Sequence, residues 1–487
     1  MITSDEYKKS LKKMRPNIYK FGELIKDVTT HPATKRTIEG HAQIFDAARK
    51  GEYKDILTTK SNLTGKQISR YLSIINSVED MIANVRMKRL MFNLTGTCTG
   101  GRCVGFNAIN AMWATTYDID KELGTNYHNN LRNWLKDAQV RDITLSGALT
   151  DPKGERALSP SQQKDPDMSL HLVKKKDDGI IVKGAKIMIC GVAASNEIFI
   201  MPGSGYKEVD KKYAISFVIP RDIENLTIVE TRRPSDEREL EEGFDNPVNI
   251  GGITQAYLLF EDVFIPKDRV FMSGEFEYSS KAVLNFIGPY RTAIGGCVAG
   301  QGDVMVGAAV LMARANGLSE KVFREKITQM IINNETTFGM GIAAGSLGKK
   351  HPSGVWIPDQ LISNVNKVHV ATLPYETKRL TQEISGGIAE TGCLPSCKDI
   401  NDLRYGDLLK KYLKANCSGE TRAKIARLIE WLTIGSGVPG CMHGGGSPDG
   451  AKLIINAKTD IENYINLAKR LGDIKEDIKV KNIKKKS

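Results

Sequence analysis

The 487-residue sequence predicts an α+β protein in which a helical part, a β-rich part and a second helical part follow one another. The spacing of apolar residues is helical up to about residue 141, changes to short β-rich runs near Asp142, and becomes helical again near Gly274. The chain is too long for one hydrophobic core, and its 41% hydrophobic content suffices for several. We therefore expect an N-terminal helical domain over 1–141, a middle β domain over 142–273 and a C-terminal helical domain over 274–487.

The N-terminal part contains two segments with strong helical spacing. Apolar residues recur every three or four positions over 68–86, and the same period continues over 103–123. Between the N-terminus and these segments, residues 29–36 contain Pro32, which predicts a loop that stops a helix.

The middle part consists of short runs rich in β-branched and aromatic residues, bounded by turn residues. Residues 179–191 predict two strands joined by a turn at Lys183-Gly184. Further strands are expected over 197–204, 213–222, 226–233 and 255–271.

The C-terminal part returns to the helical period. The segments 300–318, 321–346 and 421–435 are apolar on one face and predict long helices. The small residues Gly307, Ala308 and Ala309 should let neighbouring helices approach closely, and the lysine-rich tail after Glu476 should fray.

Composition excludes several classes of protein. The formal charge of +12 lies largely at the two ends, and no basic stripe interleaved with aromatic residues occurs, so nucleic-acid binding is not expected. No run of eighteen uncharged apolar residues predicts a membrane span, and the charged N-terminus lacks the apolar core of a signal peptide. We expect a cytoplasmic protein whose eight cysteines are thiols rather than disulfides.

Six segments resemble one known family, in matching order along nearly the whole chain. They are residues 10–32, 115–130, 147–167, 260–271, 295–309 and 442–448. The family joins 4-hydroxybutyryl-CoA dehydratase/vinylacetyl-CoA isomerase to the flavin-dependent 4-hydroxyphenylacetate 3-monooxygenases, and the sequence is more similar to the dehydratase branch. The resemblance implies an acyl-CoA-dehydrogenase-like fold, FAD as cofactor and a homotetramer.

The resemblance also implies a flavin site with three parts. The segment "ALTDPKGER" would place Leu149, Thr150 and Arg156 against the cofactor, and a second strand would bring Cys190 and Gly191 near the ring. The turn at Gly386-Gly387 is similar to one that approaches a flavin, often in a neighbouring subunit. Taken without the resemblance, the three features are a turn, a small buried cysteine and a helix C-cap.

Dehydratases of this family hold a [4Fe–4S] cluster with three cysteines and one histidine. Cys103 and Cys297 match two of those cysteines, and Cys98 is the candidate for the third. The spacer between Cys98 and Cys103 is one residue longer than in the family, and Tyr290 stands at the histidine position. Three outcomes remain: a three-cysteine cluster with an open iron, ligation by Tyr290 phenolate, or no cluster, which the two departures favour.

Catalytic positions of the dehydratases are replaced as well. Ile294 and Val298 stand where the family has tyrosine and lysine, Gln255 stands where it has glutamate, and 438–441 lack its acidic residue. Apolar side chains cannot transfer protons. The remaining catalytic candidates are Tyr290, His443 and Gln255.

Three functions follow from these observations. The first is an FAD-dependent enzyme acting on a short acyl-CoA by dehydration, double-bond isomerisation or a related step. The second is a two-component monooxygenase that takes reduced FAD from a separate flavin reductase and hydroxylates a phenol. The third is a degenerate paralogue that binds flavin without catalysis.

Overall fold

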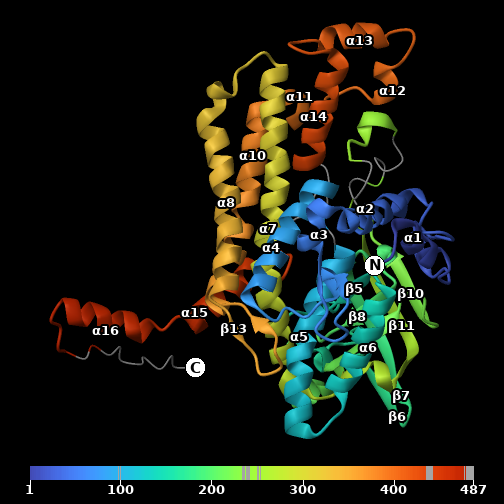
Figure 1. Cartoon of the computed structure of the whole chain (residues 1–487), viewed down its shortest axis with the longest axis vertical. Helices are drawn as coiled ribbons and strands as arrows, with labels where there is room; N and C mark the ends of the chain where they lie inside the picture. The colour runs from blue at the N-terminus through green and yellow to red at the C-terminus, as the bar shows by residue number, and fades with distance from the viewer. Residues whose placement is uncertain are drawn as a thin grey trace.

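The computed structural model describes residues 1–96, 98, 100–232, 236, 242–248, 252, 254–434, 442–476 and 478. Over these residues the order of elements is helices, then strands, then helices, as the sequence predicted (Figure 1). Two sheets form the lower part of the molecule in Figure 1, and the long helices of the C-terminal part stand above them.

The N-terminal part is helical but also supplies four short strands. Its helices and strands are α1 (Ser4–Lys12), β1 (Ile18–Lys20), β2 (Glu23–Leu24), α2 (Pro32–Arg49), α3 (Gly51–Leu57), β3 (Thr58–Lys60), β4 (Gln67–Ser69), α4 (Val78–Thr95), α5 (Gly100–Leu123) and α6 (Tyr127–Arg141). The expected stop at Pro32 is wrong, because Pro32 is the first residue of α2 and His31 caps that helix. Proline is well suited to this position, where its missing N–H is not needed.

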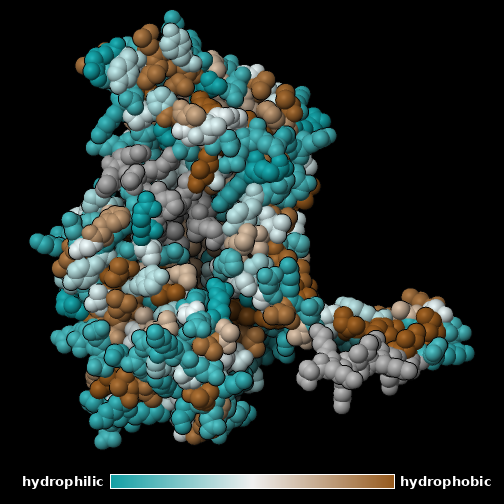
Figure 2. Space-filling model, turned by 180° about the vertical axis from the view of Figure 1, so that it is seen from behind, coloured by the Kyte–Doolittle hydropathy of each residue, from teal (hydrophilic) through white to brown (hydrophobic). Residues whose placement is uncertain are grey.

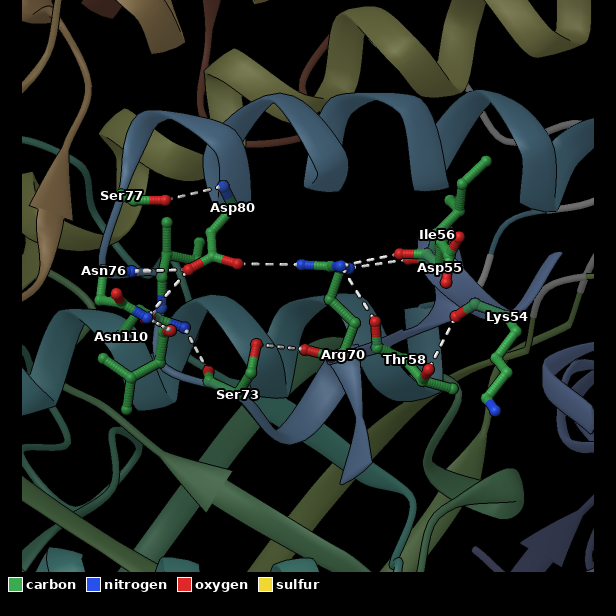
Figure 3. Close-up of polar contacts among 12 residues, drawn as sticks. Lys54, Asp55, Ile56, Thr58, Arg70, Ser73, Asn76, Ser77, Asp80 and Asn110 are labelled. Atoms are coloured by element: carbon green, nitrogen blue, oxygen red, sulfur yellow. Dashed lines mark hydrogen bonds and ion pairs between the residues drawn. The ribbon is translucent and has the colours of Figure 1, made fainter. Parts of the chain in front are cut away.

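The helix expected over 68–86 is also wrong in its first half. Residues 67–69 form β4, and α4 begins only at Val78, after Ser77 accepts a hydrogen bond from the Asp80 backbone N–H. Arg70 fixes the intervening segment: it pairs with Asp80 at 3.1 Å and donates three hydrogen bonds to backbone carbonyls (Figure 3). These bonds outweigh the helical spacing of the apolar residues.

The middle part forms two sheets with strand orders β2-β1-β10-β11-β7-β6 and β12-β9-β8-β5. Their strands are β5 (Leu145–Ala148), β6 (His171–Lys176), β7 (Gly179–Cys190), β8 (Glu197–Ile200), β9 (Ile215–Pro220), β10 (Leu226–Glu230), β11 (Gln255–Pro266) and β12 (Val270–Ser273). The turn predicted at Lys183-Gly184 is wrong, because β7 runs through it as one strand with an irregular register against β11. Strand β1 pairs with β10, so the N-terminal segment extends the first sheet.

The C-terminal part is a bundle around one very long helix. Its elements are α7 (Ser279–Ala315), α8 (Arg324–Ser346), β13 (Lys349–Lys350), β14 (Trp356–Ile357), α9 (Gln360–Val370), α10 (Leu373–Ser385), α11 (Gly387–Glu390), α12 (Cys397–Ile400), α13 (Gly406–Leu413), α14 (Gly419–Thr433), α15 (Pro448–Lys458) and α16 (Ile461–Leu471). Among the described residues, the stretch 276–315 alone is long and apolar enough to cross a membrane, but 61% of its most apolar window is buried in the protein. It is a core helix.

Close helix packing around α7 depends on glycines other than the predicted one. A Cβ on Gly296 would lie 2.1 Å from the Val85 carbonyl oxygen, whereas a Cβ on Gly307 would meet nothing within 4 Å. Helix α4 therefore packs against the first half of α7, which brings Cys297 next to the N-terminal helices.

Helix α16 forms an arm that leaves the body of the protein (Figure 1), whereas α15 packs against α9. Helix α16 buries none of its residues, and Ile461, Tyr464, Ile465, Leu467 and Leu471 are all exposed. These side chains form an apolar surface on the arm (Figure 2). An isolated helix of this length is only marginally stable in water.

Candidate functional site

The end of strand β7 meets the start of helix α5 at very short range. Gly191 has a φ of 67°, and a Cβ there would lie 2.2 Å from the Gly101 backbone nitrogen. A Cβ on Gly100 would lie 2.6 Å from the Cys190 Cβ. The glycines between Cys98 and Cys103 therefore allow the helix to start directly against the strand, and no phosphate-binding role is needed to explain them.

Two side chains from neighbouring strands meet at this junction. Gln255, the first residue of β11, is paired with Cys190 and lies with its Nε2 3.5 Å from the cysteine sulfur. Burial raises the pKa of the Cys190 thiol to about 11, so the thiol is protonated near neutral pH.

The segment that follows β5 is held by a buried lysine. Lys186 forms an ion pair with Asp151 at 2.7 Å and donates hydrogen bonds to the carbonyls of Leu149 (2.9 Å) and Met201 (3.0 Å). The Tyr206 hydroxyl donates to the other Asp151 oxygen at 2.8 Å. Lys186 thus has three oxygen partners, and it fixes the backbone carbonyl of Leu149, one of the predicted flavin contacts.

The predicted flavin residues outside this junction are more exposed. Thr150 is half-buried and Arg156 is exposed. Gly386, at the end of α10, has a φ of 71°, and a Cβ there would meet nothing within 4 Å. Gly386 and Gly387 lie in the upper part of the bundle, far from the sheets (Figure 1), so one chain does not bring them to β7.

The predicted cluster residues come together from three segments. The Cys98 and Cys103 side chains are hydrogen-bonded, and contact with Cys103, burial, and the nearby Cys297 raise the pKa of Cys98 well above its ordinary value. Burial and the same three thiols, with Cys190, raise the pKa of Tyr290. Among the described residues, no group of three His, Cys, Asp or Glu side chains is arranged around a single metal ion.

A buried lysine that the sequence analysis missed faces these thiols. Lys88 on α4 is 3% exposed, and its Nζ has no hydrogen-bond partner. Burial lowers its pKa, but Tyr71, Cys103, Cys297 and Cys98 together outweigh burial and raise it.

The remaining catalytic candidates differ in their surroundings. His443 is exposed in the glycine-rich loop before α15. Two buried cations hold that loop: Arg291 donates to the Gly445 carbonyl at 3.0 Å, and Lys367 donates to the carbonyls of Met442 (2.9 Å) and Gly444 (2.6 Å). The replaced acidic position in 438–441 lies outside the described residues.

An apolar cluster contains two positions that the sequence analysis singled out. Ile294 and Val298 pack with Val370, and Tyr290 lies against them. Tyr290 is the member of this cluster that has a titratable side chain. The change in the family's acid–base set stays a prediction.

The fold places the protein in a structural class. The structure matches that of glutaryl-coenzyme A dehydrogenase in its complex with glutaryl-CoA with a TM-score of 0.50 and 13% identity, over 84% of each chain, which shows an acyl-CoA-dehydrogenase-like fold. The models for the N-terminal and C-terminal parts of 4-hydroxyphenylacetate 3-hydroxylase match residues 3–272 and 281–473.

The chain belongs to the family of 4-hydroxyphenylacetate 3-hydroxylases and 4-hydroxybutyryl-CoA dehydratases, as the resemblance predicted. It is 38% identical to the 4-hydroxybutyryl-CoA dehydratase/vinylacetyl-CoA-Delta-isomerase of Clostridium aminobutyricum, over 98% of this chain and 100% of that protein. An oxygen-tolerant archaeal 4-hydroxybutyryl-CoA dehydratase from N. maritimus has a TM-score of 0.94 and 37% identity, covering 98% and 96% of the two chains. The Thermus thermophilus 4-hydroxyphenylacetate 3-monooxygenase oxygenase component is 26% identical over 89% of this chain and 88% of that protein.

Proposed function

We propose that the protein is an FAD-dependent cytoplasmic enzyme that acts on a short acyl-CoA thioester, by dehydration, double-bond isomerisation or a related step. Identity of 38% with the dehydratase-isomerase along the whole chain supports this proposal. The observation that carries it is the junction of β7 with α5. There the predicted flavin contacts of β7 lie beside the segment that carries the cysteines Cys98 and Cys103.

The residues around the junction fit a flavin. Lys186 fixes the Leu149 carbonyl, and the neighbouring Thr150 is half-buried with a hydroxyl that takes part in no hydrogen bond within the described part of the chain. Such a hydroxyl and the adjacent backbone suit the polar edge of the ring system, and Arg156 suits a phosphate. When bound, FAD would supply hydride or single-electron transfer.

A second subunit would complete this site. The exposed Gly386-Gly387 turn lies away from β7 of its own chain, so we assign it to the flavin of a neighbouring subunit in a homotetramer. The exposed apolar face of α16 supports assembly of several copies.

Proton transfer in this site would use a reduced set of residues. Tyr290 has its pKa raised by burial and by the nearby thiols, so it is a proton donor at neutral pH. The Gln255 side chain can orient a substrate by hydrogen bonding, but it cannot remove a proton. His443 is the remaining candidate base, carried on the loop that Arg291 and Lys367 hold.

The thiol residues are the candidate ligands of an iron–sulfur cluster. The absence of a cluster, favoured by the longer spacer and Tyr290, stays untested, but Cys98, Cys103 and Cys297 gather beside a buried cation without a hydrogen-bond partner. Thiolates are the ligands of such clusters, and we propose that these three would hold one. Tyr290, kept as a phenol, would leave one iron without a protein ligand.

The second candidate is a two-component aromatic monooxygenase served by a flavin reductase. The matches to hydroxylase family models and to the Thermus oxygenase component favour it. The third candidate, a degenerate flavin-binding paralogue, is favoured by the apolar cluster around Ile294 and Val298.

One experiment separates the three functions. The protein is purified without oxygen, its flavin is measured by visible spectrum, and it is incubated with 4-hydroxybutyryl-CoA and with vinylacetyl-CoA, whose conversion is followed by mass spectrometry. We expect bound flavin and conversion of at least one thioester. Oxygen-dependent hydroxylation of 4-hydroxyphenylacetate with reduced FAD would instead establish the monooxygenase. Bound flavin without either reaction would establish the paralogue, and the absence of flavin binding would overturn all three.

A further inference from the structure

The loop that carries His443 is held by one buried ammonium on both sides of the histidine. The Lys367 Nζ, on α9, donates to the Met442 carbonyl at 2.9 Å and to the Gly444 carbonyl at 2.6 Å. The Lys367 side chain is buried. A hydrogen bond from a charged donor is roughly twice as strong as one between neutral groups. The two residues that flank His443 are therefore fixed by the same atom.

The backbone around His443 takes its conformation from these bonds. The carbonyls before and after the histidine point at the Lys367 ammonium, and the His443 carbonyl accepts a hydrogen bond from the Gly446 backbone N–H at 3.0 Å. Each carbonyl of this tripeptide thus has a hydrogen-bond donor. The imidazole itself is exposed, so a substrate can reach it.

A second cation and an aromatic ring hold the rest of the loop. Arg291, on α7, donates from Nε to the Gly445 carbonyl at 3.0 Å, and its Nη1 donates to the Asn364 side chain of α9. Gly445 has a φ of 71°, and a Cβ there would lie 2.6 Å from the Tyr290 Cδ1. The glycine therefore lets the loop lie directly on the Tyr290 ring.

Helix α9 supports both ends of this arrangement. Lys367 and Asn366 are neighbours in α9, which packs against both α7 and α15. The Asn366 Nδ2 donates to the Arg291 backbone carbonyl at 3.1 Å, which ties α9 to α7. At the far end of the loop, Ser447 caps α15 by accepting from the Gly450 N–H at 3.0 Å. The loop is thus anchored at its middle and at its end.

We infer that Lys367 is a positioning residue that holds His443 for proton transfer, and that Arg291 holds the same loop against Tyr290. The inference rests on the proposed function, in which His443 is the candidate base. In double-bond isomerisation, the neutral imidazole takes the proton from the carbon beside the thioester carbonyl and returns it to the far carbon of the double bond, so no other reactant is consumed.

The composition of the loop explains why such a clamp is needed. Three consecutive glycines follow His443, and glycine has more conformational freedom than any other residue. A base must lie within hydrogen-bond reach of the proton that it removes, and a misplacement of about 1 Å can lower a rate about 100-fold. The two buried cations restrict the freedom that the glycines give.

The first test measures the loop without any reaction. Amide hydrogen exchange is followed by mass spectrometry in full-length wild type, in Lys367→Met, and in the matched control Lys349→Met, at an exposed lysine of β13. We expect the amides of 442–447 to exchange about 10-fold faster in Lys367→Met, a factor that corresponds to one net hydrogen bond. Exchange in β7 should be unchanged, and Lys349→Met should match wild type throughout.

The second test asks whether Lys367 acts through His443. Isomerisation of vinylacetyl-CoA is measured in wild type, Lys367→Met, His443→Gln and the double variant. We expect kcat of Lys367→Met to fall about 100-fold while KM stays unchanged. The double variant should be no slower than His443→Gln alone, because a positioning residue has no effect once the group that it positions is absent.

A pair of glycine variants keeps the test decisive if Lys367→Met fails to fold. Gly445→Ala pushes the loop away from the Tyr290 ring and leaves both cations in place, so it should speed exchange in the loop and lower kcat. Gly307→Ala is the matched control, because a Cβ there meets nothing within 4 Å. It should change neither quantity.

The outcomes that overturn the inference differ from failure of the enzyme. Equal exchange of the loop amides in wild type and Lys367→Met would overturn the clamp. A fall in kcat by the same factor with and without His443 would overturn the route through the histidine. Wild-type protein that isomerises no thioester would defeat the proposed function and the role in proton transfer, whereas faster loop exchange in Lys367→Met would still establish the clamp.

Discussion

Two buried lysines lie in the two halves of the candidate site, and their surroundings differ completely. Lys186, on the sheet side, has a carboxylate at 2.7 Å and two backbone carbonyls as partners. Lys88, on the helical side, has no hydrogen-bond partner. Oxygen atoms thus surround the first ammonium, whereas the second lies against the rings of Tyr71 and Phe106.

The largest expected effect on stability comes from removing the carboxylate partner of Lys186. Asp151→Ala leaves Lys186 charged and buried beside Tyr206, and removing one partner of a buried pair destabilises a protein by about 3–5 kcal/mol. Urea unfolding of wild-type and variant proteins measures this loss. Since the Leu149 carbonyl depends on Lys186, flavin affinity should fall together with stability. A variant that keeps wild-type stability would show that the pair contributes little.

In iron-free protein, substitution of the other lysine, Lys88, is expected to raise the free energy of unfolding. Lys88→Met removes a buried cation without a hydrogen-bond partner and keeps the volume of the side chain. Because an unsatisfied buried group costs about 1–3 kcal/mol, the iron-free variant should be more stable than wild type by that order. Urea unfolding in the presence of a chelator measures the difference. A less stable variant would mean that the lysine already has its partner within the protein.

Sequence patterns predicted the two halves unequally. The order of helices and strands followed from hydrophobic spacing, and the meeting of Cys98, Cys103 and Cys297 followed from family resemblance. Lys88 was missed, although its position on the apolar face of α4, between Met81 and Phe92, is a readable signal. Burial of a charge depends on what faces it from other segments, and spacing along one helix does not report that.

Side-chain hydrogen bonds and helix caps also decided local structure where the spacing of apolar residues had predicted another element. Residues 68–77 have helical apolar spacing, yet Arg70 bonds three backbone carbonyls, and the segment forms a short 3-10 helix at Arg70–Leu72 instead of an α-helix. Ser77, three residues before Asp80, marks the true helix start, and that capping pattern is visible in the sequence. Pro32 likewise marks a beginning rather than an end.

A smaller, pH-dependent effect on stability is expected at His41, which lies against the start of α5 between the two halves of the candidate site. His41 lies against Gly101 and accepts a hydrogen bond from Arg102 at 3.3 Å. Burial, with a smaller contribution from Arg102, lowers its pKa from 6.5 to about 3. The unfolded chain therefore binds more protons between these values, and stability falls as the pH drops through this window.

The measurement compares wild type with His41→Gln, which removes the titrating group. The contribution of His41 should be lost gradually below pH 6.5, reaching about 1.4 kcal/mol near pH 5.5. Urea midpoints across this range should fall more steeply for wild type than for the variant. Parallel curves would mean that His41 is already protonated in the folded protein.

The smallest effect on the two lysine environments is expected from removing the arm. A chain ending at Thr459 lacks α16, which buries none of its residues and exposes an apolar face. We expect that face to contact another copy of the chain. Light scattering should show a smaller assembly than for the full chain, while the urea midpoint of the body and the iron content of each subunit stay unchanged. Replacing Ile461 and Ile465 together by serine is the matched test, because it keeps the arm and removes its apolar face. A fall in iron content upon truncation would mean that the thiol site depends on a neighbouring subunit, and the contrast between Lys186 and Lys88 would then belong to the assembly rather than to one chain.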